Sequence, residues 1–168
     1  MKFFIEINNR PQQRILTYVV EEYSFDISPI VKEIDFDLVI NNLNLTVADK
    51  KVIQVWGLCP YSSWIKANYS VPNFKKGTLK VIDDLKPGFS YGLNDVEWPI
   101  YVNHQTGWVC IGNPEKSGKA VEFINNCVAV FDDNGELMSL WLRPKKPKNK
   151  NQYFKSEAIH GICNSVNG

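Results

Sequence analysis

Residues 120–142 constrain the fold more than any other part of the sequence. Two apolar runs, 120–131 and 136–142, are separated by the polar residues 132–135, which end in Asn134-Gly135. Asn-Gly supplies the positive φ angles that a tight turn between antiparallel strands requires. The sequence therefore predicts a β-hairpin. A short helix is the alternative for the first part, residues 117–125.

Alternation of apolar and polar residues extends the strand pattern over much of the chain. Pro11 could open a helix that buries Ile15, Leu16, Val19 and Tyr23, but residues 17–20 are equally typical of a strand. We expect an α+β fold, a mainly antiparallel β-sheet with one or two short helices, and hold all-β as the second choice. The remaining expected strands are residues 3–7, 36–40, 43–47, 52–56, 64–71, 78–82, 100–102 and 108–111.

The length of 168 residues fits one domain, and 44% hydrophobic residues give it a sizeable core. We expect residues 1–142 to form a single β-rich globular domain. After Leu142 the composition changes, because residues 143–151 contain two prolines and no apolar side chain. The sequence predicts a basic, solvated and mobile segment over residues 143–168, with a helical turn over 152–159.

Charge is distributed unevenly although the formal net charge is only +1. The basic residues of the C-terminal segment leave an acidic excess on the rest of the chain. A docking surface for a basic protein is one interpretation of the acidic stretch, and a solvated face is the other. Its acidic residues are Glu21, Glu22, Asp26, Glu33, Asp35 and Asp37.

The amino terminus does not resemble a signal peptide, because Glu6 interrupts its short apolar run. No apolar stretch approaches the length that spans a bilayer, so we expect a cytoplasmic protein without membrane contact. The cysteines are far apart and form no CxxC pair. We expect them to be reduced, buried and free of zinc, and we expect no cofactor. They are Cys59, Cys110, Cys127 and Cys163.

Residues 88–92, Gly-Phe-Ser-Tyr-Gly, match the GxSxG pattern of a nucleophile elbow. The elbow needs a strand before the serine and a helix after it, and the sequence after Ser90 is not typical of a helix. The order Ser90, Asp132 or Asp133, His160 is formally that of such hydrolases. A small serine hydrolase is therefore an alternative function, although a glycine-flanked loop explains the motif better.

Residues 112–120 partly match a phosphate-binding P-loop. Five residues separate Gly112 from Gly118 where the loop needs four, and Ala120 stands where a hydroxyl would bind Mg²⁺. We therefore interpret the segment as a polar loop between strands.

Tryptophans divide by context into two groups. Trp56, Trp108 and Trp141 lie within apolar strands, and we expect them in the core. Trp64 and Trp98 lie beside polar or proline-containing loops, so we expect them to be exposed and able to bind a ligand. A carbohydrate- or nucleic-acid-binding domain built on such aromatics is a further alternative. The acidic excess argues against nucleic acid as a partner.

These observations favour a non-enzymatic protein-binding module whose acidic face binds a basic protein. A bacterial immunity protein that neutralises a nuclease toxin is one concrete form of this hypothesis. The expected binding residues are the acidic residues above together with Trp64 and Trp98. No catalytic or metal-ligating residue is expected.

Overall fold

The computed structural model describes residues 1–145, and its strands form one 14-stranded sheet that curls into a half-barrel. The strands of the first half are β1 (Phe3–Ile7), β2 (Ile15–Val19), β3 (Ser24–Ser28), β4 (Phe36–Ile40), β5 (Leu43–Ala48) and β6 (Lys51–Leu58). Those that follow are β7 (Trp64–Lys66), β8 (Lys75–Val81), β9 (Ser90–Gly92), β10 (Ile100–Val102), β11 (Val109–Gly112), β12 (Lys119–Ile124), β13 (Cys127–Phe131) and β14 (Leu137–Leu142).

The α+β expectation is wrong. Residues 1–145 contain no α-helix, only the 3-10 turns η1 (Val20–Glu22) and η2 (Tyr61–Ser63). Both segments that could have been helical pair with neighbours instead. β2 pairs with β3 along its whole length, and β12 pairs with β13. Cross-strand hydrogen bonding thus overrides the helical spacing of the apolar side chains in residues 11–23.

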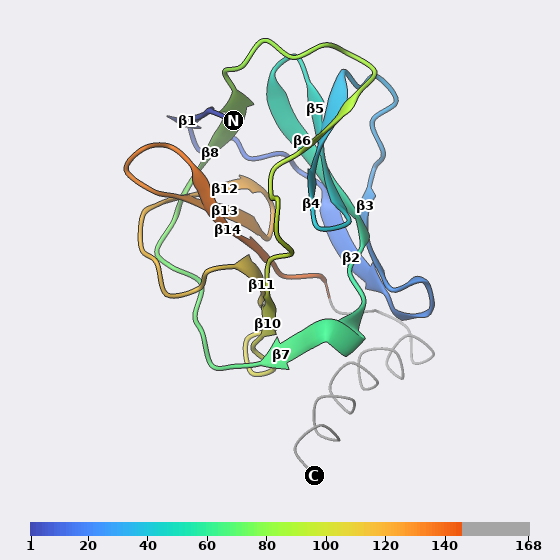
Figure 1. The fold of residues 1–168 in the computed structure, drawn as a ribbon, viewed down its shortest axis with the longest axis vertical. Coiled ribbons are helices and arrows are strands. Elements are labelled where there is room, and N and C mark those ends of the chain that lie inside the picture. The colour runs from blue at the N-terminus through green and yellow to red at the C-terminus, as the bar shows by residue number, and fades with distance from the viewer. Residues whose placement is uncertain (146–168) are drawn as a thin grey trace.

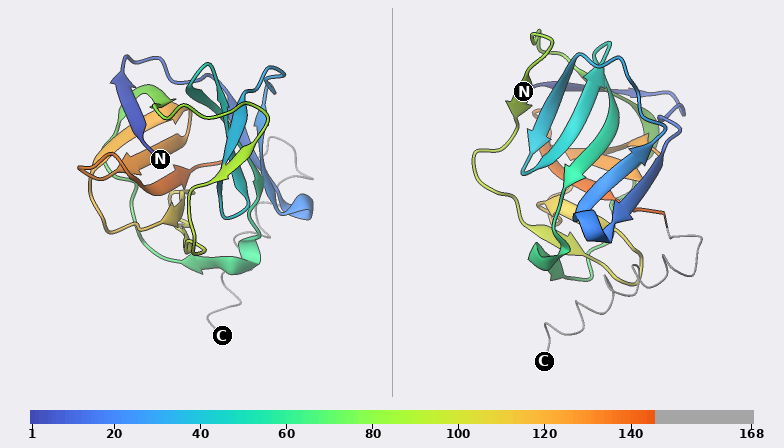
Figure 2. Two further views of the ribbon diagram at one scale, coloured as in Figure 1. Left: turned by 45° about the horizontal axis from the view of Figure 1, so that its top comes forward. Right: turned by 90° about the vertical axis from the view of Figure 1, so that its right-hand side faces the viewer.

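Two halves of the curled sheet face each other (Figures 1 and 2). One half contains β2–β6 and β9, and the other contains β10–β14 with β7. β8 joins them, because it pairs with β6 of one half and with β12 of the other. β1 also pairs with β8. The main core lies between the halves and combines side chains such as Phe25, Val55, Phe123 and Leu140.

β13 is buried on both faces, which explains its continuous apolar sequence. Cys127, Ala129 and Phe131 pack into the main core. Val128 and Val130 belong to a second cluster on the opposite face, with Trp108 and Trp141.

The second cluster is covered by residues that follow the short strand β7. Tyr69 and Val71 pack against it, and the amide of Ala67 donates to the carbonyl of Val102 at 3.0 Å. The strand expected over residues 64–71 is therefore only three residues long. The residues that follow it, up to Val71, cover the second cluster instead.

The predicted hairpin at 132–135 is present, and β10 and β11 form a second antiparallel pair across residues 103–108. At the first, Gly135 has a positive φ of 78° and Asn134 does not, so only one of the two residues takes the left-handed conformation. The pairing shifts between Val130 and Phe131, as expected of a hairpin loop with a bulge. At the β5–β6 turn both Asp49 and Lys50 have positive φ, which is the type I′ geometry.

Arg143 is exposed but contacts the domain through Trp108 and Asn126. Its guanidinium lies 4.9 Å from the centre of the Trp108 ring and donates to Oδ1 of Asn126. The amide of Lys145 donates to the carbonyl of Leu16 at 2.8 Å. The rest of the predicted mobile segment, residues 146–168, lies outside the described residues, as do the predicted helical turn and His160 and Cys163.

Candidate functional site

One face of the β3-β6-β5-β4 sheet points away from the core and carries polar and aromatic side chains. The opposite face of the same strands carries residues such as Phe25, Val55 and Leu45, which are buried between the halves. Because side chains alternate across a strand, their neighbours in sequence point outward. We call this surface the outer face and define it by Asp26, Asp37, Asn44, Thr46, Trp56 and Leu58.

Trp56 is the central aromatic residue of the outer face. Its side chain is 41% exposed, whereas a core position was expected. The expectation is wrong because Val55 and Gly57 occupy the inward positions of β6, which directs Trp56 outward. Its strand is apolar, but apolar composition alone does not fix which residues face the core.

A hydrogen-bond chain fixes the Trp56 indole in place. Trp56 Nε1 donates to Oγ1 of Thr46 at 2.9 Å, and that hydroxyl donates to Oδ1 of Asp37 at 2.6 Å. Thr46 is fully buried beneath the two side chains. The exposed aromatic surface is therefore held in one orientation by its neighbours on β5 and β4.

Asp26 stands on the other side of Trp56. β3 and β6 pair through Ser24–Leu58 and Phe25–Gly57, and Asp26 and Trp56 are the next residues along the two strands, on the same face of the sheet. Asp26 is exposed, and so is Leu58, two residues beyond Trp56 on the same face. The outer face thus combines carboxylates with an exposed tryptophan and an exposed leucine.

The connection between β3 and β4 crosses one end of the outer face. The amide of Val31 donates to Oε1 of Gln54 at 2.7 Å, which places this loop over β6. Glu33 and Ile34 are exposed on the loop, Ile34 to 50%. An acidic and an apolar side chain therefore extend the surface beyond the strands.

Glu33, Asp35 and Asp37 do not form the continuous strand face that simple alternation predicts. β4 begins only at Phe36, and Ile34 is exposed rather than buried. The carboxylate of Asp35 accepts a hydrogen bond from the amide of Asp49 at 2.8 Å. Asp35 and Asp37 thus stabilise local structure, whereas Glu33 is exposed on the loop.

Glu21 and Glu22 lie at the opposite end of β3, in η1. Strands rise roughly 3.3 Å per residue, so the five residues of β3 separate its two ends by roughly 16 Å. This exceeds the Debye length of about 8 Å at physiological ionic strength. The acidic side chains are therefore spread along β3 and the segments next to it, with Asp26 near the middle, and do not form one cluster.

Trp64 is 8% exposed, so the expectation of an exposed binding residue is wrong. Its ring packs 5.0 Å from Tyr18 and 6.1 Å from Phe25, measured between ring centres. These partners come from β2 and β3, which the sequence does not place beside it. Trp98 is half-buried and lines a separate pocket, whereas Trp108 and Trp141 are buried as predicted.

Ser90 is exposed and opens the short strand β9, which runs parallel to β4. In residues 1–145 no α-helix follows it, so the strand-turn-helix context of a nucleophile elbow is missing. The P-loop-like segment likewise leads from β11 into the strand β12 and not into a helix. Gly118 there lies so close to the carbonyl of Phe131 that a side chain would not fit.

Three of the cysteines are buried free thiols, as predicted for Cys59, Cys110 and Cys127. Burial raises the pKa of Cys59 and of Cys110 to about 12, and raises the pKa of Cys127 still further. Within the described part of the chain, no three His, Cys, Asp or Glu residues are grouped as metal ligands would be. No helix in residues 1–145 has the length and apolar character needed to cross a membrane.

No protein family matches this sequence, and no curated protein is significantly similar to it.

Proposed function

We propose that this protein is a non-enzymatic protein-binding module that docks a basic partner on the outer face. The observation that carries the proposal is Trp56, which is exposed yet fixed by the Thr46 hydroxyl and flanked by carboxylates. Binding energy at protein interfaces concentrates in a few residues, and tryptophan is the most typical of them. An aromatic ring that is already oriented loses little side-chain entropy on binding.

The surrounding charges favour a basic partner. Asp26 follows Phe25 on the neighbouring strand β3 and is exposed, and Glu33 is exposed on the loop that follows β3. An arginine of the partner could stack on the indole ring and pair with the Asp26 carboxylate at the same time. The more distant Glu21 and Glu22 would contribute mainly to long-range attraction, which speeds association more than it strengthens binding.

A toxin-neutralising immunity protein is one form of this proposal, since the nucleic-acid-binding surface of a nuclease is basic and complementary to the outer face. A cytoplasmic location is also part of the proposal. Buried free thiols support it, because they suit a reducing compartment.

The experiment compares which partner proteins bind to four immobilised forms of this protein. The four forms are wild type, Asp26→Lys, Trp56→Ala and Asp133→Lys. Asp133 is exposed on the β13–β14 hairpin, outside the outer face, and serves as the matched charge control. A partner captured by wild type and by Asp133→Lys but lost with both outer-face variants supports the proposal. We expect Trp56→Ala to weaken binding about 30-fold or more.

Association kinetics of the captured partner provide the second measurement. Asp26→Lys should slow association at low salt and flatten its salt dependence, because ions screen the attraction. Thermal unfolding of each variant verifies that it is folded. A partner that binds all four folded proteins equally, with an association rate insensitive to salt, would refute the outer-face proposal.

A further inference from the structure

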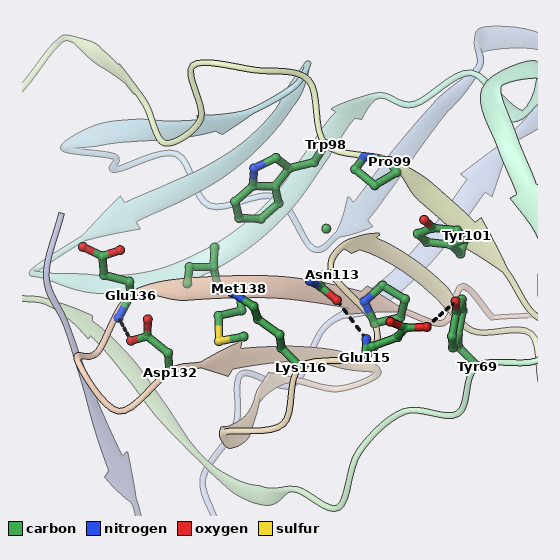
Figure 3. Close-up of a pocket in the computed structure, with 13 residues that line it drawn as sticks. Tyr69, Trp98, Pro99, Tyr101, Asn113, Glu115, Lys116, Asp132, Glu136 and Met138 are labelled. Carbon is green, nitrogen blue, oxygen red and sulfur yellow. Dashed lines mark hydrogen bonds between the residues drawn. The ribbon is translucent and has the colours of Figure 1, made fainter.

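A second surface feature lies away from the outer face, between the β11–β12 loop and the β13–β14 hairpin. It is an open pocket of about 550 Å³ lined by aromatic and charged side chains (Figure 3). This volume is within the usual range for small-ligand sites. The aromatic residues are Tyr69, Trp98 and Tyr101, and the charged ones are Glu115, Lys116, Asp132 and Glu136.

Trp98 is held rigidly at the wall of this pocket. Its amide donates to Oδ1 of Asn41 at 2.9 Å, and its carbonyl accepts from Nδ2 of Asn41 at 3.0 Å. The ring lies against Gly112, where a Cβ atom would approach Trp98 Cε3 to 2.9 Å. The glycine therefore makes room for the indole, and the β4–β5 turn fixes its backbone.

The Tyr69 side of the pocket is also ordered. The Tyr69 hydroxyl donates to Oε1 of Glu115 at 3.2 Å, and the Tyr69 ring packs edge-to-face on Tyr101 at 5.2 Å. The Glu115 amide donates to Oδ1 of Asn113, which fixes the loop that carries the carboxylate. Glu115 and an aromatic pair are thus placed together.

Charge distinguishes this pocket from a neutral site. Three carboxylates and one ammonium group line it, so its lining carries an acidic excess. Asp132 stabilises the hairpin turn, because its Oδ1 accepts from the amides of Asn134 and Glu136. In the view of Figure 3, Glu136 lies at one end and Glu115 at the other, with Trp98 between them on one side.

We propose that the pocket binds a guanidinium group, which stacks on one of the aromatic rings, Trp98 or Tyr101, and pairs with the carboxylate at one end of the pocket, Glu115 or Glu136. A guanidinium is planar, stacks on aromatic rings and pairs with carboxylates through two parallel hydrogen bonds. A phosphate or another anion is disfavoured by the carboxylates. This site is distinct from the outer face and uses different elements.

The test is a titration followed by NMR with N-acetyl-arginine-amide and with its neutral analogue N-acetyl-citrulline-amide. The two probes have nearly the same shape but differ in charge. We expect the arginine probe to shift the Trp98 indole signal and to bind about tenfold more tightly than the citrulline probe. Its affinity should fall as salt is added.

Variants identify the groups responsible. Glu115→Gln combined with Glu136→Gln should weaken the arginine probe about tenfold, whereas Asp133→Asn, on the same hairpin but outside the pocket, should not. The side-chain amide oxygen introduced by Glu115→Gln can still accept from the Tyr69 hydroxyl, so the loop contact survives the change. Free arginine that binds more tightly than the blocked probe would support the guanidinium site and identify a free amino acid as its source.

Two results would overturn the inference. Equal affinity for the arginine and citrulline probes would show that charge recognition is absent. Shifts confined to the Trp56 indole would place the cation on the outer face and leave the pocket without a guanidinium ligand. The indole signals of Trp56 and Trp98 are observed separately. Absence of binding in the pocket can therefore be distinguished from absence of the proposed docking on the outer face.

Discussion

Thr46 Oγ1 donates a 2.6 Å hydrogen bond to Asp37 Oδ1 while it accepts one from Trp56, so a single buried hydroxyl links three neighbouring strands on the outer face. Asp37 lies directly opposite Thr46, whereas Trp56 lies opposite Asn44 and reaches Thr46 diagonally across the two strands. The arrangement makes an acidic side chain part of the support for an exposed aromatic one. A variant that removes the hydroxyl should therefore lower the free energy of unfolding and also make the Trp56 side chain more mobile.

Thr46→Val removes this hydroxyl at nearly constant volume. We expect the free energy of unfolding, measured by urea denaturation, to fall by about 1–2 kcal/mol, since Asp37 and Trp56 each lose a partner. The Trp56 ring should also become more mobile, as measured by NMR relaxation of its indole N–H. Thr17→Val, at a half-exposed threonine of β2, is the control and should change stability by less than about 0.5 kcal/mol. Equal effects of the two variants would contradict a supporting role for Thr46.

Gly112→Ala tests the contact that seats Trp98. Gly112 has a φ of +111°, and an added Cβ would lie 2.5 Å from the carbonyl oxygen of Met138. We expect destabilisation of about 2 kcal/mol or more, from strained backbone and overpacking together. Gly92→Ala is the matched control, since nothing lies within 4 Å of its added Cβ. A Gly112→Ala protein as stable as Gly92→Ala would show that the strand bends easily at this position.

Buried thiols predict how stability changes at alkaline pH. In the folded protein the pKa of Cys59 and of Cys110 is raised to about 12, whereas in the unfolded chain thiols lose their proton near pH 8.5. The folded state therefore holds more protons above that pH, and the free energy of unfolding falls as pH rises from about 8.5 toward 12. Urea denaturation between these limits should give a shallower fall for Cys110→Ala. An unchanged slope would mean that Cys110 ionises in the folded protein.

Ser90 is expected not to act as a nucleophile, because no helix follows β9 in the described chain to form an oxyanion site. A fluorophosphonate probe should leave the protein unlabelled, as measured by intact mass. Labelling that disappears in Ser90→Ala would show that the serine is activated after all. The same experiment on the denatured protein controls for nonspecific reaction.

Local sequence patterns predicted many of the strands and turns. Alternation over residues 36–40 and 43–47 identified β4 and β5. The hairpin at residues 132–135 followed from its Asn-Gly pair and two flanking apolar runs. These features depend on neighbours within a few residues, and a turn or a strand is encoded at that range.

Tertiary structure decided which side of each strand faces the core and what covers the other side. Trp56 is exposed and Trp64 buried, the reverse of the expectation, because β6 directs Trp56 outward while Tyr18 and Phe25 enclose Trp64. Residues 15–19 became a strand only because β3 supplies hydrogen-bond partners. The alternation of apolar and polar residues by itself predicted a β-rich chain. Strand register determined the outer face, since shifting the pairing by one residue exchanges the inward and outward side chains.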